Sequence, residues 1–312
     1  MGPMEESYSE AMRIALEEAR VSLREGNKGF GAVLVKDGEV VARAHDRAVT
    51  DSDPTAHAEM NLVREASKRF ADLSGCAVVS THEPCPMCTG ALVWARVSEI
   101  AYGASIEGSR RQGRTMIDLG CREIVERAPW KVTVTGGVLE EKCSRLYDED
   151  VRKLVKAFRS GDGPGELGRA LLERRVAWFD ENADALRGTL RGTAVDRAYQ
   201  LILMKIGIDE EEAPIVERSD VRIVFHSMNF CPALEACEIL GLDTREVCRE
   251  HTERATEALI RRIDDRLRFE RNYERLRPRA PYCEETISLG GPADPIRTLG
   301  GSPVREIDLH KD

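Results

Sequence analysis

The fold of this chain is decided by two stretches, Asp53-Pro54-Thr55-Ala56-His57-Ala58-Glu59 and Glu83-Pro84-Cys85-Pro86-Met87-Cys88. Proline is the second residue of each stretch, and we expect each to lie where a loop enters a helix. His57, Cys85 and Cys88 together offer one nitrogen and two sulfur ligands, a set that zinc favours. The sequence therefore predicts a zinc site beside two helix N-termini.

The number of ligands indicates what kind of zinc site this is. Three protein ligands leave the fourth tetrahedral position open for water, as in catalytic sites and unlike closed structural ones. The partial positive charge at a helix start stabilises thiolates, and the spacing of Cys85 and Cys88 brings both sulfurs to one side of the first turn. A Cys-x-x-Cys pair alone is also typical of structural or redox sites, but its occurrence after His-x-Glu favours catalysis.

Glu59 is the candidate catalytic residue. It follows His57 by two residues, so its side chain points elsewhere than at the metal and can face the bound water. Zinc would lower the pKa of that water to near neutrality. Glu59 would accept the proton and pass it to a ring nitrogen and then to the departing amine. We therefore predict a hydrolytic deaminase that releases ammonia from an aminated heterocycle.

The residues around these stretches alternate between strand and helix patterns. Asp37-Gly38 is a strong hairpin signal between two apolar runs. We expect helices over residues 7–24, 57–68 and 86–96, and strands over residues 31–36, 39–44, 76–80, 99–103 and 131–135. The sequence thus predicts a small α/β domain with helices packed on the faces of one sheet.

The motifs of the first half resemble the cytidine deaminase superfamily, close to its guanine deaminase and tRNA adenosine deaminase branch. The similarity runs from about Gly29 to Leu146 and includes Gly29–Val35, the two stretches quoted above and Val134–Leu139. The resemblance implies a three-layer domain with a five-stranded mixed sheet. It also implies a homodimer or higher homo-oligomer.

Four further residues are candidates for contacting the substrate. Members of the superfamily usually carry Asn eleven residues before the zinc-binding His, and this chain has Asp46 there. Ionised Asp offers only acceptors, so it would favour an N–H, a hydroxyl or a cationic ring. The alternative is a local turn bond or a pair with Arg47. Phe30 and His82 flank the matched motifs and, with Ala58, are expected to line the site, although Phe30 equally fits ordinary core packing.

Three functions remain open. The first is deamination of a free nucleobase, nucleoside or related small molecule of the guanine or cytosine type. The second is editing of adenosine in tRNA, which the net charge of −9 disfavours. A basic cluster that could contact tRNA is formed by Arg110, Arg111 and Arg114, although these residues equally fit an ordinary solvent-exposed loop. The third is a non-catalytic zinc protein that uses the fold for assembly, and Glu59 argues against it.

The chain is long enough for two domains. Ser160-Gly161-Asp162-Gly163-Pro164-Gly165 has no helical periodicity, so we expect a deaminase domain over 1–159, a linker over 160–165 and a C-terminal domain over 166–289. Residues 290–312 are rich in Gly and Pro and are expected to be a flexible tail. The C-terminal domain should be a smaller α+β or α/β domain, with helices near 166–178, 193–206 and 243–263 and strands near 221–225, 267–269 and 286–289.

Four of the nine cysteines lie in this second domain, at Cys231, Cys237, Cys248 and Cys283. Four thiolates would suit a second metal or an iron–sulfur cluster, although none of the spacings is Cys-x-x-Cys. A catalytic thiol and plain core packing are the alternatives. Through its Cys231-Pro232 start and its late Cys283-Glu284-Glu285, this half also resembles L-2-amino-thiazoline-4-carboxylate hydrolases, without a catalytic residue to carry over.

The cellular location follows from what the sequence lacks. The first residues have neither the basic nor the apolar region of a signal peptide. No apolar run approaches the length of a membrane span. We therefore expect a cytoplasmic protein with no membrane partner. Its expected partner is a small-molecule substrate, on the grounds given above.

Overall fold

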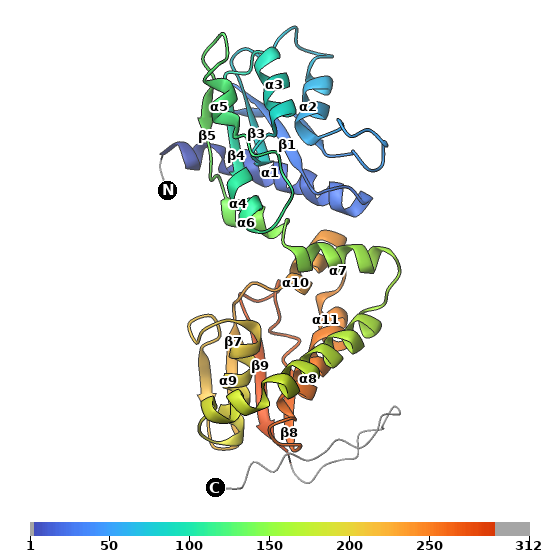
Figure 1. Ribbon diagram of the computed structural model, residues 1–312, viewed down its shortest axis with the longest axis vertical. Helices are drawn as coiled ribbons and strands as arrows, with labels where there is room; N and C mark the ends of the chain where they lie inside the picture. The colour runs from blue at the N-terminus through green and yellow to red at the C-terminus, as the bar shows by residue number, and fades with distance from the viewer. Residues whose placement is uncertain (1–2, 291–312) are drawn as a thin grey trace. The chain divides into compact units, whose positions relative to one another are not determined.

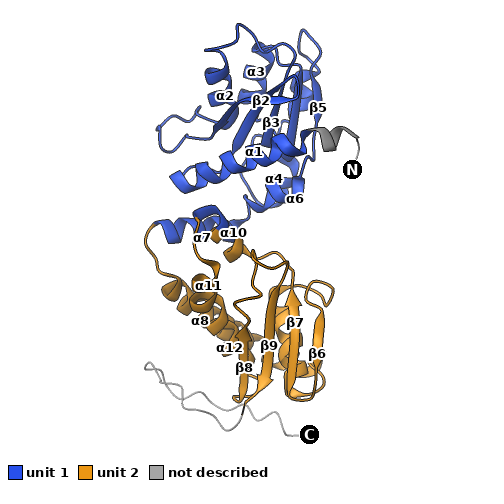
Figure 2. Cartoon of the chain, turned by 180° about the vertical axis from the view of Figure 1, so that it is seen from behind, with its two compact units in different colours: residues 1–159, 238–240 blue, residues 160–237, 241–312 orange. Residues whose placement is uncertain are grey.

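A computed structural model describes residues 3–290 of the chain. The contacts divide it into two compact units (Figures 1 and 2). Unit 1 comprises the residues up to Arg159 together with Glu238–Leu240, and unit 2 comprises Ser160–Cys237 and the residues from Gly241. The predicted flexible tail lies outside the described residues, apart from Gly290.

Unit 1 is built on a five-stranded mixed sheet of order β2-β1-β3-β4-β5. Its strands are β1 (Gly31–Lys36), β2 (Glu39–His45), β3 (Cys76–His82), β4 (Glu99–Ala104) and β5 (Thr133–Thr135). β1 pairs antiparallel with β2 and β3, whereas β3, β4 and β5 are parallel. Asp37 and Gly38 both have positive φ, which matches the tight hairpin turn that the sequence predicts. The predicted cytidine deaminase-like fold class is confirmed.

Helices cover both faces of this sheet. α2 (Ala58–Ala66), α3 (Pro86–Trp94) and α5 (Cys121–Val125) share one hydrophobic core with inward residues of β1, β3 and β4. α1 (Pro3–Glu25) packs closely on β1. Only glycine fits at position 31, since a Cβ there would lie 2.0 Å from the carbonyl oxygen of Ala15. Three further helices complete the unit: α4 (Ile106–Arg111), α6 (Glu140–Arg145) and α7 (Glu149–Arg159).

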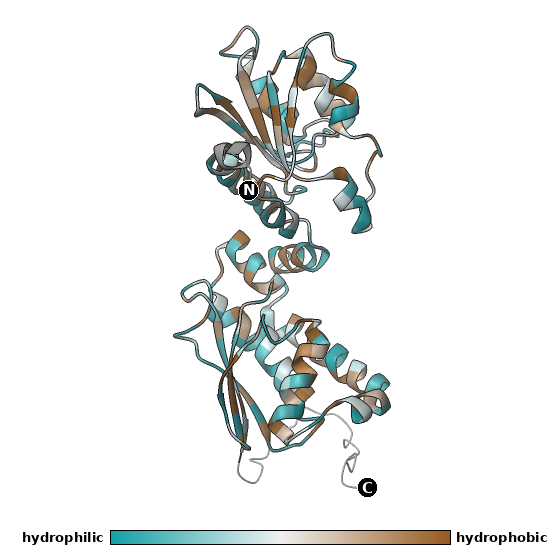
Figure 3. Ribbon diagram, turned by 90° about the vertical axis from the view of Figure 1, so that its left-hand side faces the viewer, coloured by the Kyte–Doolittle hydropathy of each residue, from teal (hydrophilic) through white to brown (hydrophobic). Residues whose placement is uncertain are grey.

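Unit 2 contains a four-stranded antiparallel sheet of order β6-β7-β9-β8. Its strands are β6 (Ile215–Arg218), β7 (Arg222–Ser227), β8 (Leu267–Arg271) and β9 (Cys283–Leu289). Its helices are α8 (Pro164–Thr189), α9 (Ala194–Ile206), α10 (Pro232–Leu240), α11 (Thr244–Val247), the π-helix η1 (Cys248–Glu253) and α12 (Arg254–Ile260). Figure 3 shows hydrophobic residues along the strands, and one core joins their inward residues to α8, α9 and α12. The second, α+β region is thus present as predicted.

Three details of unit 2 differ from the sequence-based expectation. α8 begins at Pro164 inside the stretch expected to be a linker, because proline is favoured in the first turn of a helix. β6 was not expected. Asp243 caps a helix as predicted, with its side chain accepting from the N–H of Arg245, but the helix passes through η1 and ends at Ile260.

None of the helices within residues 3–290 has both the length and the apolar composition that a membrane span requires.

Candidate active site

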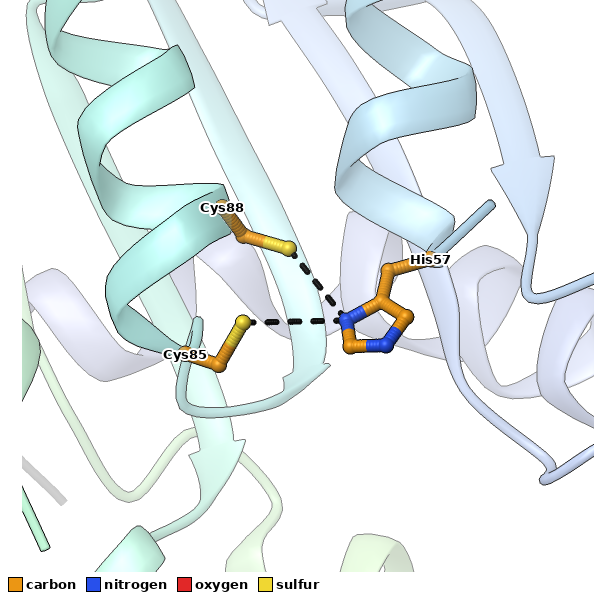
Figure 4. Close-up of side chains that lie close together, drawn as sticks. All are labelled: His57, Cys85 and Cys88. Carbon is orange, nitrogen blue, oxygen red and sulfur yellow. Dashed lines mark hydrogen bonds between the residues drawn. The ribbon is translucent and has the colours of Figure 1, made fainter. Parts of the chain in front are cut away.

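The candidate metal ligands come from two helix starts on the same side of the sheet. His57 is the N-cap of α2, and Cys85 is the N-cap of α3. Pro86 occupies the first turn of α3, where its missing N–H removes no helical hydrogen bond. Cys88 lies one turn further along the same helix, and Figure 4 shows both sulfurs pointing at the imidazole of His57.

The separations between these atoms fit a zinc ion. The Nδ1 atom of His57 lies 3.6 Å from the Sγ atom of Cys85 and 3.6 Å from that of Cys88. Ligands about 2.3 Å (sulfur) and about 2.0 Å (nitrogen) from zinc, at the tetrahedral angle, lie about 3.5 Å apart, close to the separations found here. All three ligand atoms lie within 4.8 Å of one another. The donor set and its spacing therefore suit a tetrahedral zinc site.

The two thiols are strongly coupled. Hydrogen bonds from Cys88 and from His57 lower the pKa of the Cys85 thiol to about 4. The pKa of Cys88 is raised, first by its hydrogen bond to Cys85 and then by burial. One thiolate is thus already favoured, and zinc binding would displace the remaining protons.

Glu59 lies beside these ligands in the first turn of α2 and is buried. Its Oε1 atom accepts a hydrogen bond of 2.7 Å from the hydroxyl of Ser80 on β3. Burial raises the pKa of the Glu59 carboxyl, and the Ser80 bond partly opposes this effect. The pKa of Cys88 is also raised by Glu59, which places the carboxyl next to the ligand sulfur. Glu59 is therefore buried beside the candidate metal ligands and held by Ser80.

Asp46 lies at the end of β2 and is fully buried. Its Oδ1 atom accepts from the N–H of Lys28 at 3.3 Å, while its Oδ2 atom is buried and has no hydrogen-bond partner among the described residues. Arg47, the other partner considered for it, instead pairs with Asp51 at 3.0 Å. The pKa of His57 is raised first by Cys85, and Glu59 and Asp46 add to this effect.

Phe30 and His82 belong to an aromatic cluster with Tyr147. The three rings lie 5.2 to 5.4 Å apart, and the guanidinium of Arg114 covers Phe30 and Tyr147. The His82 ring is bound at both nitrogens, to the carbonyl of Glu83 and to the hydroxyl of Ser109. Burial lowers its pKa to about 4, so the ring is neutral at ordinary pH.

Comparisons with known proteins agree with this geometry. Residues 5–104 match the family described as the cytidine and deoxycytidylate deaminase zinc-binding region. The tRNA-specific adenosine deaminase of Bacillus subtilis is 39% identical over 153 residues, which are 47% of this chain and 92% of that protein. The chain belongs to the cytidine deaminase superfamily.

Two further relatives illustrate the range of this superfamily. The guanine deaminase of Bacillus subtilis is 46% identical over 77 residues, 24% of this chain and 49% of that protein. A solved structure of guanine deaminase from Nitrosomonas europaea is 26% identical, with a TM-score of 0.38, and covers 44% of this chain and 80% of that one. The family match and the similarity to the tRNA-specific adenosine deaminase of Bacillus subtilis show that the chain is a zinc-dependent hydrolytic deaminase.

Sequence reasoning missed residues that organise the deaminase site. Glu83 is buried, and its two carboxylate oxygens accept from the backbone N–H groups of Ile106 and Cys121, at 2.9 and 2.8 Å. It therefore fixes the starts of α4 and α5 next to Cys85. Only its place in the second quoted stretch could have signalled it. Tyr147 and Arg114 come from distant segments and carry no local signal.

Two other candidates have a different place from the one expected. The side chain of Ala58 lies in the hydrophobic core of unit 1, so only its backbone is available to a substrate.

The second metal or cluster site is not supported. His57, Cys85 and Cys88 form the one group within residues 3–290 whose ligand atoms converge on a metal position. No three of Cys231, Cys237, Cys248 and Cys283 form such a group among the described residues.

Proposed function

We propose that unit 1 hydrolytically removes an amino group from a small aminated heterocycle, with His57, Cys85 and Cys88 as zinc ligands and Glu59 as the proton carrier. The observation that carries this proposal is the buried carboxyl of Glu59 next to Cys88, oriented by Ser80. Bound zinc supplies a water nucleophile at neutral pH. The raised pKa of Glu59 suits a group that accepts a proton and then donates it to the leaving amine.

We propose further that Asp46 recognises one edge of the heterocycle by accepting a hydrogen bond from it. Its Oδ2 atom is a buried acceptor without a partner, and such an atom carries a cost until a donor reaches it. A carboxylate accepts hydrogen bonds but donates none. The preferred substrate should therefore present an N–H, an amino group or a cationic ring nitrogen at this edge rather than a carbonyl.

A small molecule is favoured over tRNA by the partners of the basic cluster. Arg110 pairs with Asp118 and Arg111 with Glu107, while Arg114 lies over aromatic rings. These pairs reduce the positive charge that phosphates would meet, and the whole chain carries a net charge of −9. The tRNA alternative rests on the 39% identity to a tRNA-specific adenosine deaminase.

An ammonia-release screen tests the proposal. Zinc-loaded protein is incubated with purines, pyrimidines, triazines and their nucleosides, and in parallel with tRNA at several salt concentrations. Release from a free heterocycle, lost in Glu59→Gln, supports the proposal. Release from tRNA alone, with the steep salt dependence of phosphate contacts, would establish the alternative.

A further inference from the structure

At one end of the unit 2 sheet, the buried side chains are polar instead of apolar. Side chains alternate along a strand, so Glu285 and Cys283 share the face of β9 that carries Ile287. Ile287 belongs to the hydrophobic core, and Glu285 is buried as well. On β7, the inward row passes from Phe225 in the core to the buried Ser227. A row of buried side chains that changes from apolar to polar departs from the usual pattern of a hydrophobic core. Natural proteins show such departures at functional sites.

The carboxylate of Glu285 is fully engaged by its neighbours on the sheet. Arg271 lies opposite Glu285 in the register of β8 and β9, and its Nε atom donates to Oε1 at 2.7 Å. The hydroxyl of Ser227 donates to Oε2, also at 2.7 Å. The side chains of Arg271 and Glu285 are only 11% and 8% exposed. The second donor group of Arg271 reaches the hydroxyl of Thr252 in η1.

A second guanidinium faces this pair from the helices. Arg175 on α8 donates to the hydroxyl of Thr256. Burial, and after it repulsion from Arg271, lower its pKa to about 10. Within residues 3–290 no carboxylate forms an ion pair with Arg175. Glu285 attracts its guanidinium electrostatically, but this carboxylate is already paired with Arg271.

The charges of this cluster do not cancel. Two guanidinium groups face one carboxylate, and burial lowers the pKa of the neighbouring His251 to about 4, so this ring adds no negative or positive charge. Arg175 is partly buried, and a charge that is shielded from water without an opposite charge is destabilising. The cluster is therefore complementary to one further negative charge.

Thiols lie around the same position. Cys231 is the N-cap of the nine-residue helix α10 and lies within electrostatic range of both Arg175 and Arg271. Its side chain is partly exposed, so a reagent in solution can reach it. Cys248, in contrast, is buried, and burial raises its pKa to about 12. Cys231 is thus the accessible thiol next to the two guanidinium groups.

The backbone beside the cluster is also unusual. η1 is a π-helical segment, a form that is rare and frequent at functional sites. α8 approaches it so closely that a Cβ at Gly168 would lie 2.1 Å from the carbonyl oxygen of Glu250. Gly168 and Arg175 are two helical turns apart and so share one face of α8. The close contact directs Arg175 toward η1 and the sheet.

We propose that unit 2 carries a second ligand site, in which Arg175 and Arg271 bind a small organic anion beside the thiol of Cys231. The guanidinium groups supply the charge and planar donors that suit a carboxylate. The site is independent of the deaminase site in unit 1 and uses none of its residues.

Paired alkylating reagents test this proposal on the full chain. Iodoacetate carries a carboxylate and iodoacetamide is neutral, so the ratio of their rates at one thiol measures attraction of an anion. The rates at Cys231 are followed by peptide mass spectrometry in zinc-loaded protein. We expect the iodoacetate-to-iodoacetamide ratio to be at least about tenfold higher than at the same thiol in urea, because a buried charge attracts an anion far more strongly than a solvated one.

Two variants separate the site from the general charge of the surface. Arg175→Gln should return the ratio to its value in urea, whereas Arg169→Gln, which removes an exposed charge from the same helix, should leave it unchanged. If Arg175→Gln does not fold, protection of Cys231 from iodoacetamide by oxalate, but not by chloride at equal ionic strength, replaces it. A native ratio equal to that in urea, or no protection by oxalate, overturns the proposal.

Discussion

At the scale of single residues, Glu59 is the group on which turnover should depend most. Glu59→Gln keeps the hydrogen bond from Ser80 within reach but cannot carry a proton. We expect turnover to fall by about a hundredfold to ten-thousandfold, the range of general acid–base catalysis. Ammonia release and zinc content measured together check this, with the exposed Glu65→Gln on the same helix as the control. Normal turnover in a folded Glu59→Gln protein would refute the assigned role.

Asp46 should act on substrate choice rather than on the chemistry. Asp46→Asn replaces one acceptor oxygen by an amide donor of the same size. We expect preference to shift by about tenfold or more toward heterocycles with a carbonyl at that edge, since a buried polar group left without a partner costs about 1 to 3 kcal/mol. Ratios of kcat/KM over the substrate panel measure it. An unchanged order of preference would make Asp46 purely structural.

At the scale of elements, α1 and β2 are joined by a titratable contact. His45 on β2 lies 2.8 Å from Glu18 and 3.1 Å from Glu25 on α1. The pKa of His45 is raised above its ordinary 6.5, first by the bond to Glu18. Its contribution to stability is therefore complete below about pH 6.5 and is lost as the pH rises through the higher folded value.

The free energy of unfolding should accordingly decrease above pH 6.5, by about 1.5 kcal/mol, the lower end of the range for hydrogen bonds to charged groups. Urea denaturation of the wild type and of His45→Gln at a series of pH values checks this. The difference between the two proteins should shrink as the pH rises. A difference that stays constant from pH 6 to pH 9 would remove His45 from this role.

α3 is apolar on its outer as well as its inner side. Trp94 is 79% exposed and Met87 is 36% exposed, although both belong to a nine-residue helix without a charged side chain. A helix that is hydrophobic all round is normally covered. We propose that a second copy of the chain covers α3, and we expect Trp94→Glu to weaken self-association by about tenfold or more. Sedimentation velocity over a concentration series measures this, and a monomeric wild type would contradict it.

At the scale of the whole molecule, zinc should contribute to stability as well as to catalysis. Metal that binds only the folded state stabilises it according to concentration and affinity, by about 4 kcal/mol at a thousandfold excess over Kd. We expect a chelator to lower the Tm of the wild type by several degrees. Calorimetry should find no such shift in Cys88→Ser, which lacks a ligand. Equal shifts in both proteins would mean that the chelator acts elsewhere.

The features that could be predicted from the sequence are local ones. The hairpin at Asp37-Gly38, the helix starts at His57 and Cys85 and the cap at Asp243 each depend on a few neighbouring residues, and the structure contains all of them. The features that were missed depend on distant partners. β6 is largely exposed and lacks an alternating apolar pattern, and η1 lies where α8 approaches closely at Gly168.

The same distinction holds for the candidate sites. The spacing of Cys85 and Cys88 is visible in the sequence, but the stacking of Arg114 on Tyr147 is not, because the two residues are 33 positions apart in the chain. The four cysteines of unit 2 suggested a metal by their number alone. Sequence spacing carried no information about the arginines and the glutamate that surround them.

The single carboxylate of Glu83 has a consequence for the motions of unit 1. Because it anchors the amides of both Ile106 and Cys121, those two amides should be protected against hydrogen–deuterium exchange and should open together. The segment between them carries Arg114, which covers the aromatic rings near the site. One opening event would therefore release two helix starts and the segment between them, so that Glu83 sets the frequency at which this side of the deaminase site fluctuates.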